Sequence, residues 1–164
     1  MKKIILILAV VLTTTVFTSN ANAQSKGQLG VGANFEIGTG EDYTNYGIGF
    51  KFQYTPINNL RLEPSITYFF EKDYIDSWDF TANVHYLFNA ANNLYLYPIA
   101  GIGATGYRVN SKFADYSETK FAFNFGAGAE VMVSSAVGLN FEYKYRIVDD
   151  WNRSHITLGC VYKF

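Results

Sequence analysis

The sequence has 164 residues and a formal net charge of −1, which fits one domain and excludes a strongly basic surface for binding nucleic acid. Charged residues make up 16% of the chain, against roughly 25% in an average soluble domain, whereas aromatic residues reach 18%. Cys160 is the only cysteine, so an internal disulfide is excluded.

The first segment has the layout of a secretory signal peptide. Two lysines precede an apolar run over residues 4–17, and a polar stretch then leads to Ala21-Asn22-Ala23. A charged start, an apolar middle and a small-x-small end are typical of a cleaved leader. We therefore expect residues 1–23 to be a signal peptide that is cleaved after Ala23, and residues 24–164 to be the exported domain. A transmembrane anchor is the alternative, but the apolar run is short for a membrane-spanning helix.

From residue 28 onward, apolar and polar residues alternate with period two. Successive side chains of a strand point to opposite faces, so this period predicts β-strands with one apolar face. Each segment is close to the roughly 9–11 residues with which a tilted strand crosses a bilayer. The eight predicted strands span residues 28–39, 45–55, 60–70, 77–88, 94–107, 121–133, 137–146 and 154–164.

The stretches between these strands are short turns and longer polar loops. A turn as short as 134–136 joins neighbouring antiparallel strands in a hairpin, and residues 121–146 show this unit most clearly. The other two predicted turns cover residues 56–59 and 89–93. The predicted loops cover residues 40–44, 71–76, 108–119 and 149–153.

One hairpin motif occurs twice. The frame Asn-Asn-Leu-x-Leu-x-Pro covers residues 58–64 and again residues 92–98. Pro64 and Pro98 lack a backbone N–H, so neither can complete the hydrogen-bond ladder of a central strand. Because both prolines follow their turns at the same offset, we expect one shared adjustment, a bulge or a strand end near the rim of the sheet.

Alternation alone does not say which face points inward. A soluble barrel of lipocalin type buries its apolar face, whereas a membrane barrel turns that face toward lipid. Sparse charge and a glycine-rich polar face favour the membrane barrel. Aromatic residues also gather near both ends of the strands, as the two interfaces of a bilayer require. They are Tyr43, Tyr46, Phe70, Trp78 and Tyr145 at the loop ends, and Tyr54, Phe88 and Phe164 at the turn ends.

The last predicted strand carries Leu158, Cys160, Tyr162 and Phe164 on its apolar face. This ending resembles the C-terminal signature of Gram-negative outer membrane barrels, which implies recognition by the barrel-assembly machinery. Together with residues 125–145, it makes the chain similar to the small eight-stranded barrels typified by the membrane domain of outer membrane protein A and by outer membrane protein X, and to the "porin family" β-barrel domain.

The resemblance implies a fold and a location. The expected fold is all-β, an eight-stranded antiparallel up-and-down transmembrane β-barrel in the outer membrane. Both termini and the short turns would then be periplasmic, and the four loops would face outward. The implied partners are outer membrane lipid and lipopolysaccharide, and we expect a monomer without a cofactor.

The polar face supplies the candidate functional residues. Eight strands leave an interior just wide enough for side chains, and buried charges must pair, so we interpret these residues as a network that plugs the lumen. The protein would then be a structural scaffold that displays short loops; a narrow pore for ions or small solutes is the alternative. The network consists of five acids and five bases: Glu36, Glu63, Asp79, Glu130, Glu142, Lys51, Arg61, Lys144, Arg146 and Lys163.

A second alternative is a lipid-modifying outer membrane enzyme. His155 follows Ser154 directly, with Asp149 and Asp150 nearby, and His85 lies on the polar face of its strand. Neighbours along a strand point to opposite faces, so Ser154 and His155 cannot form a catalytic dyad. No dense cluster of histidine, cysteine and carboxylate indicates zinc. We therefore expect neither an enzyme nor a metal site.

Overall fold

The structure is a computed structural model that describes residues 26–40, 43–72, 75–111, 114–149 and 151–164. The predicted signal peptide and its cleavage site at Ala23 lie outside these ranges. Within them, no helix has the length and apolar character needed to cross a membrane.

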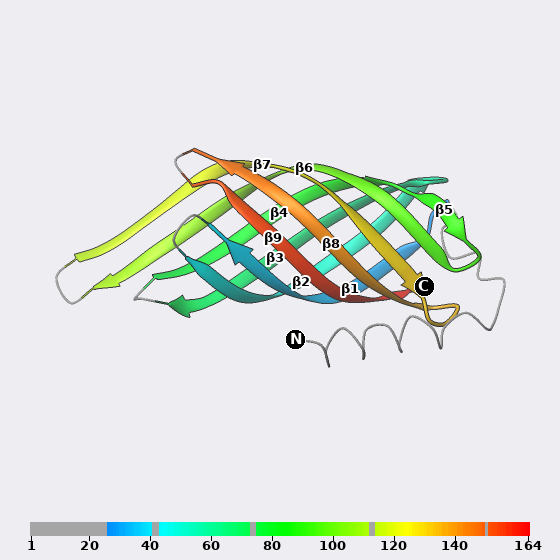
Figure 1. Cartoon of the computed structure of the whole chain (residues 1–164), viewed down its shortest axis with the longest axis horizontal. Coiled ribbons are helices and arrows are strands. Elements are labelled where there is room, and N and C mark those ends of the chain that lie inside the picture. The colour runs from blue at the N-terminus through cyan, green and yellow to red at the C-terminus, as the bar shows by residue number, and fades with distance from the viewer. Residues whose placement is uncertain (1–25, 41–42, 73–74, 112–113, 150) are drawn as a thin grey trace.

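The described residues form one closed antiparallel sheet. Neighbouring strands pair in sequence order, and the pairings β1–β9 and β4–β6 complete the circle (Figure 1). β5 continues the path of β4 and pairs with the same partner, β6, so the barrel has eight strands around, as predicted. The strands are β1 (Leu29–Thr39), β2 (Thr44–Ile57), β3 (Leu60–Lys72), β4 (Ile75–Tyr86), β5 (Phe88–Ala91), β6 (Leu94–Ser111), β7 (Ala114–Met132), β8 (Val137–Val148) and β9 (Arg153–Lys163).

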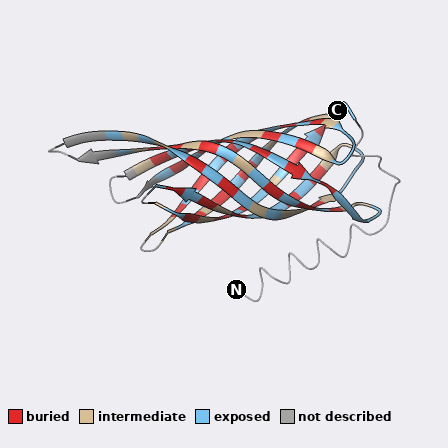
Figure 2. Ribbon diagram, turned by 90° about the horizontal axis from the view of Figure 1, so that it is seen from above, coloured by how far each residue is buried: buried red, intermediate tan, exposed pale blue. Residues whose placement is uncertain are grey.

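The apolar face of the barrel points outward. On β2, Ile48, Phe50 and Phe52 are exposed, whereas Lys51 and Gln53 between and beside them are buried. Figure 2 shows the same alternation of buried and exposed residues along the other strands. A soluble barrel would show the opposite pattern, so the wall has the polarity of a protein that lies in lipid.

The two proline motifs share one adjustment, as expected. Pairing between β2 and β3 is interrupted opposite Pro64, and the path from β4 to β5 is interrupted opposite Pro98. In both hairpins the register then shifts just before the Asn-Asn turn. The second asparagine of each turn also donates its side-chain amide to the next hairpin, Asn59 to the carbonyl of Leu87 at 2.8 Å and Asn93 to that of Met132 at 3.3 Å.

The predicted loop at residues 108–119 is wrong for most of its length. β6 and β7 stay paired out to Ser111↔Ala114, whereas β8 begins to pair with β7 only at Ala122↔Val148. The two strands therefore form a hairpin that projects beyond the rest of the barrel at its loop end (Figure 1). The contrast between an apolar and a polar face fades where a strand leaves the membrane, so the period-two signal fades with it.

Other boundaries move by a few residues. The predicted turns at 56–59 and 89–93 contract to two residues each, because β2 and β5 run up to the asparagines. The predicted loops at 71–76 and 149–153 also shorten, since β3 extends to Lys72, β4 begins at Ile75 and β9 begins at Arg153. The last change matters for the site, because Arg153 becomes the first residue of β9 rather than a loop residue.

Candidate functional site

The lumen is the candidate site. The structure places all ten charged residues of the predicted network inside the barrel, and none is more than 5% exposed. It adds three basic side chains that are also buried there, Arg153, His85 and His155. Arg153 shares strand parity with His155 and Thr157, so the alternation of β9 could have identified it once the strand was started one residue earlier.

In the turn-side half of the lumen, Glu130 lies between two cations. Arg61 Nη1 donates to Glu130 Oε2 at 2.7 Å, and Lys163 Nζ pairs with Glu130 Oε1. Arg61 also donates to Gln53, whose amide donates in turn to Glu63 at 2.6 Å. These residues come from β2, β3, β7 and β9, so the contacts cross the lumen rather than follow its wall.

Two aromatic side chains are part of the same layer. The Arg61 guanidinium lies 4.7 Å from the ring centroid of Tyr97, and the His85 ring stacks on Tyr97 at 4.8 Å. His85 Nδ1 accepts a hydrogen bond from Arg61 Nε at 3.2 Å, which assigns the ring hydrogen of the neutral imidazole to Nε2. The Tyr97 hydroxyl donates to Glu142 at 3.1 Å.

Glu142 links the turn-side charges to Lys144 and Glu36. Its carboxylate lies 3.4 Å from Lys51 Nζ and 3.3 Å from Lys144 Nζ, and it accepts a hydrogen bond from Asn140 at 2.6 Å. Lys51 also lies 3.7 Å from Glu63 on one side, while Lys144 lies 3.8 Å from Glu36 on the other. The charges from Lys163 to Glu36 therefore form one connected system.

In the loop-side half, Asp79 takes the place of Glu130. Arg146 and Arg153 both pair with it, the latter from Nη2 at 3.1 Å, and the Thr105 hydroxyl donates to it at 2.7 Å. Arg146 also donates from Nε to Asn124 at 2.8 Å.

Buried apolar residues close the turn end of the lumen. Leu87, Tyr95, Tyr97, Ile99 and Met132 form a cluster on the inner face of the barrel. The backbone N–H groups of Leu87 and Met132 donate to the carbonyls of the two turn asparagines, which places the cluster at that rim. The period-two pattern missed this cluster because it assigns apolar side chains to the outer face.

Aromatic side chains surround Arg153 at the loop end. Its guanidinium lies 5.7 Å from the ring centroid of Phe69 and 4.5 Å from that of Trp151. Trp151 packs in turn on Tyr43 and Tyr107, with ring centroids 5.3 and 5.0 Å away. Burial raises the pKa of the Tyr43 phenol to about 12, so this ring remains neutral under physiological conditions.

Two triads in the lumen have the spacing of a metal site. They are Glu36, Asp79, His155 and Glu63, His85, Glu142, whose ligand atoms lie within 4.8 Å of one another. Neither triad fits a cation. Asp79 already pairs with two arginines and Glu142 with two lysines, while the hydrogen on His85 Nε2 blocks that nitrogen as a ligand. His155 Nδ1 lies 2.6 Å from Glu36 Oε1, so this pair is already engaged.

The residues weighed for catalysis do not come together. His155 points into the lumen, whereas Ser154 is partly exposed and its hydroxyl lies 3.1 Å from the Tyr143 hydroxyl on the outer face. Asp149 is exposed at the rim, and Asp150 lies outside the described residues.

The outer wall carries the residues of the C-terminal signature. Leu158, Cys160, Tyr162 and Phe164 all point outward from β9 and the residue that follows it, and Phe164 is 63% exposed. Most of the aromatic residues expected near the bilayer interfaces are exposed too: Tyr46, Phe70 and Trp78 at the loop ends, and Tyr54, Phe88 and Phe164 at the turn ends. Tyr43 differs, because it packs on Trp151 at the rim.

A closed antiparallel barrel with a charged interior and an apolar outer wall defines an outer membrane β-barrel protein. The profile of one such family, described as the outer membrane protein beta-barrel domain, matches residues 7–164. The chain belongs to this family. A search of curated proteins found no match.

Solved structures show the same fold. Neisserial surface protein A is 17% identical with a TM-score of 0.70, over 84% of this chain and 96% of that one. Ail, the attachment invasion locus protein of Yersinia pestis, is 22% identical with a TM-score of 0.59, over 85% and 99%. The N-terminal barrel domain of OprF from Pseudomonas aeruginosa is 15% identical with a TM-score of 0.64, over 86% and 100%.

Proposed function

We propose that the protein is a plugged outer membrane scaffold that holds the β6–β7 hairpin above the membrane surface. The buried ion pairs are the observation that carries this proposal, because they fill the lumen in two groups, one that runs from Lys163 to Glu36 and one that Arg146 and Arg153 form with Asp79 at the loop end. The apolar cluster at the turn end and the aromatic contacts of Arg153 at the loop end add to the closure.

A narrow pore is the second candidate function. The buried oxygen atoms without a hydrogen-bond partner among the described residues include Asn34 Oδ1, Asn140 Oδ1 and Thr157 Oγ1. They lie on the adjacent strands β1, β8 and β9, with Asn34 and Asn140 on either side of Gly159. Buried polar oxygens of this kind are sites for ordered water, and a file of water along these strands could carry ions if the network were mobile.

Single-channel conductance in planar bilayers separates the two functions. Protein purified from the outer membrane, whose folding is verified by its heat-dependent gel mobility, is expected to give no conductance above that of a protein-free bilayer. Steady channels whose conductance changes in Glu130→Ala or Arg146→Ala would instead identify the charged lumen as a pathway and overturn the scaffold proposal.

The proposal includes an orientation. We infer that the turns and both termini are periplasmic and that the β6–β7 hairpin is extracellular. In a Cys160→Ala background, a membrane-impermeant maleimide should label Ser117→Cys on intact cells but should label Asn58→Cys, in the turn between β2 and β3, only after the outer membrane is permeabilised. The reverse labelling pattern would invert the orientation.

The partners follow from the same placement. We propose that the barrel-assembly machinery reads Leu158, Cys160, Tyr162 and Phe164, and that the folded monomer contacts lipopolysaccharide at its outer rim. Absence of enzymatic activity is part of the proposal, supported by the separation of Ser154 from His155 across the barrel wall.

A further inference from the structure

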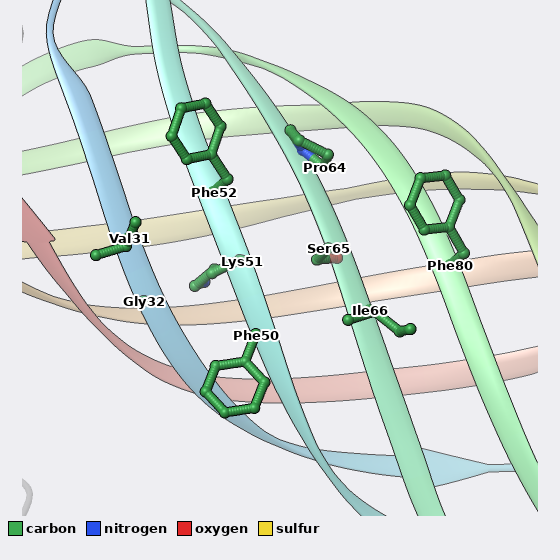
Figure 3. A pocket seen from close by; sticks show the side chains of 9 residues that line it. All are labelled: Val31, Gly32, Phe50, Lys51, Phe52, Pro64, Ser65, Ile66 and Phe80. Carbon is green, nitrogen blue, oxygen red and sulfur yellow. The ribbon is translucent and has the colours of Figure 1, made fainter.

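The lipid-facing wall is not uniform. A groove of about 340 Å³ lies on the side formed by β1 to β4. Figure 3 shows Pro64 between the rings of Phe52 and Phe80, with Phe50 and Ile66 further along the same strands. Val31 on β1 completes the outward-pointing lining. The volume falls near the lower end of the roughly 300–1,000 Å³ of small-molecule sites.

The proline motif explains why the groove lies at this place. Pro64 has no N–H to donate, and the β2–β3 ladder is interrupted where Phe52 and Gln53 face Glu63 and Pro64. Its ring is also short compared with the neighbouring phenylalanines. Phe50, 71% exposed, is the most exposed large apolar side chain among the described residues. The outer surface of the barrel is therefore depressed at Pro64, and the longer side chains around it project further from the wall.

We propose that this groove, lined by Val31, Phe50, Phe52, Pro64, Ile66 and Phe80, holds one acyl chain of a phospholipid as a resident lipid. It is continuous with the lipid-facing wall, so hydrocarbon is the medium that reaches it. An unbranched, flexible acyl chain can lie between the rings. It supplies the dispersion contacts that the side chains lining the groove lack when the groove is empty. Polar ligands are disfavoured, because the outward-pointing side chains that line the groove are apolar.

The position of the groove selects the phospholipid. Pro64 is four residues from the start of β3, and Val31 is two residues from the start of β1, both at the turn end of the barrel. The groove therefore runs from the middle of the wall toward the turns. With the turns in the periplasm, as proposed above, this depth belongs to the inner leaflet, where the outer membrane carries phospholipid. The retention of a lipid does not depend on this orientation; the leaflet does.

Native mass spectrometry of the protein extracted from outer membranes in mild detergent tests retention. The wild-type barrel is expected to carry one phospholipid, and Val31→Phe, which fills the groove, is expected to lose it. Val84→Phe is the matched control, because Val84 is also on the outer wall near the turn end and is similarly exposed, at 41% against 48% for Val31, but lies outside the groove. Equal retention in the two variants, or none in the wild type, would overturn the site.

Photo-crosslinking in living cells tests the lipid class. With p-benzoylphenylalanine in place of Phe52, phospholipid adducts should form several-fold more often than with the same residue in place of Phe141, on β8 and outside the groove, and Val31→Phe should remove the excess. Equal adduct yields at the two positions would contradict a resident lipid. A lipid A adduct at position 52 would overturn the assignment to phospholipid. The Ser117→Cys labelling then shows whether the proposed orientation is wrong or the groove does not select phospholipid.

Discussion

At the residue scale, the lumen is held together by charged side chains that are buried away from water. Each of them therefore depends on its partner within the protein. Glu130 is fully buried between Arg61 and Lys163. The desolvation of such groups is offset only while each keeps an opposite charge, so the loss of one partner costs far more than the pair contributes in net stability. The network is therefore a strong constraint on which substitutions the barrel accepts, even where it adds little net stability.

Glu130→Gln should destabilise the barrel by about 3–5 kcal/mol, because it leaves two buried cations without their carboxylate. Urea unfolding in lipid vesicles measures this free energy. The double variant Glu130→Gln with Arg61→Met should lose less unfolding free energy than the two single variants lose together, since it removes one of the two cations that had paired with Glu130. Additive losses would mean that the two side chains do not interact in the membrane. Phe141→Leu, on the outer wall, is the control and should change stability little.

At the element scale, strand type was predictable and strand length was not. The period-two pattern predicts eight strands because each must present an apolar face to lipid, and the network residues follow from the same parity. Arg153 was missed because it is the first residue of β9. A strand boundary placed one residue too late assigns it to the loop instead of the lumen. Leu87 and Met132 were missed because they are apolar residues on the polar face, and only the packing of the turn end explains them.

The repeated Asn-Asn turns give an internal comparison. Asn59 has φ +69°, the only positive value among the described residues other than glycine, while Asn59 and Asn93 make equivalent side-chain hydrogen bonds. Both Asn59→Ala and Asn93→Ala lose about 1 kcal/mol with the hydrogen bond. Asn59→Ala should lose roughly 1–2 kcal/mol more, the cost of a left-handed conformation for a residue with a Cβ. Asn59→Gly should avoid that second loss. Urea unfolding measures all three, and equal losses for the two alanine variants would contradict the backbone argument.

At the scale of the whole molecule, the barrel and the projecting hairpin are distinct in what stabilises them. The network, the apolar cluster and the lipid-facing wall all lie within the body of the barrel. β6 pairs with β4 as far as Ile75↔Val109, and beyond that point the hairpin is held by its own ladder, from Asn110↔Asp115 to Ser111↔Ala114. This division explains why composition and alternation identified the membrane protein but not the hairpin, because residues 108–119 do not alternate between apolar and polar.

The division predicts that the hairpin can be shortened without loss of the fold. Replacing residues 109–116 by Asn-Gly joins the paired residues Arg108 and Ser117 through a two-residue hairpin turn. The shortened protein should still assemble in the outer membrane, keep its heat-dependent gel mobility, and unfold in urea within about 0.5 kcal/mol of the wild type, because the buried ion pairs are untouched and only the last pair of the β4–β6 ladder, Ile75↔Val109, is lost. The same Asn-Gly replacement at residues 134–135 is the control for a change of turn alone. A shortened protein that fails to assemble, while the control assembles normally, would show that the barrel needs the hairpin in order to fold.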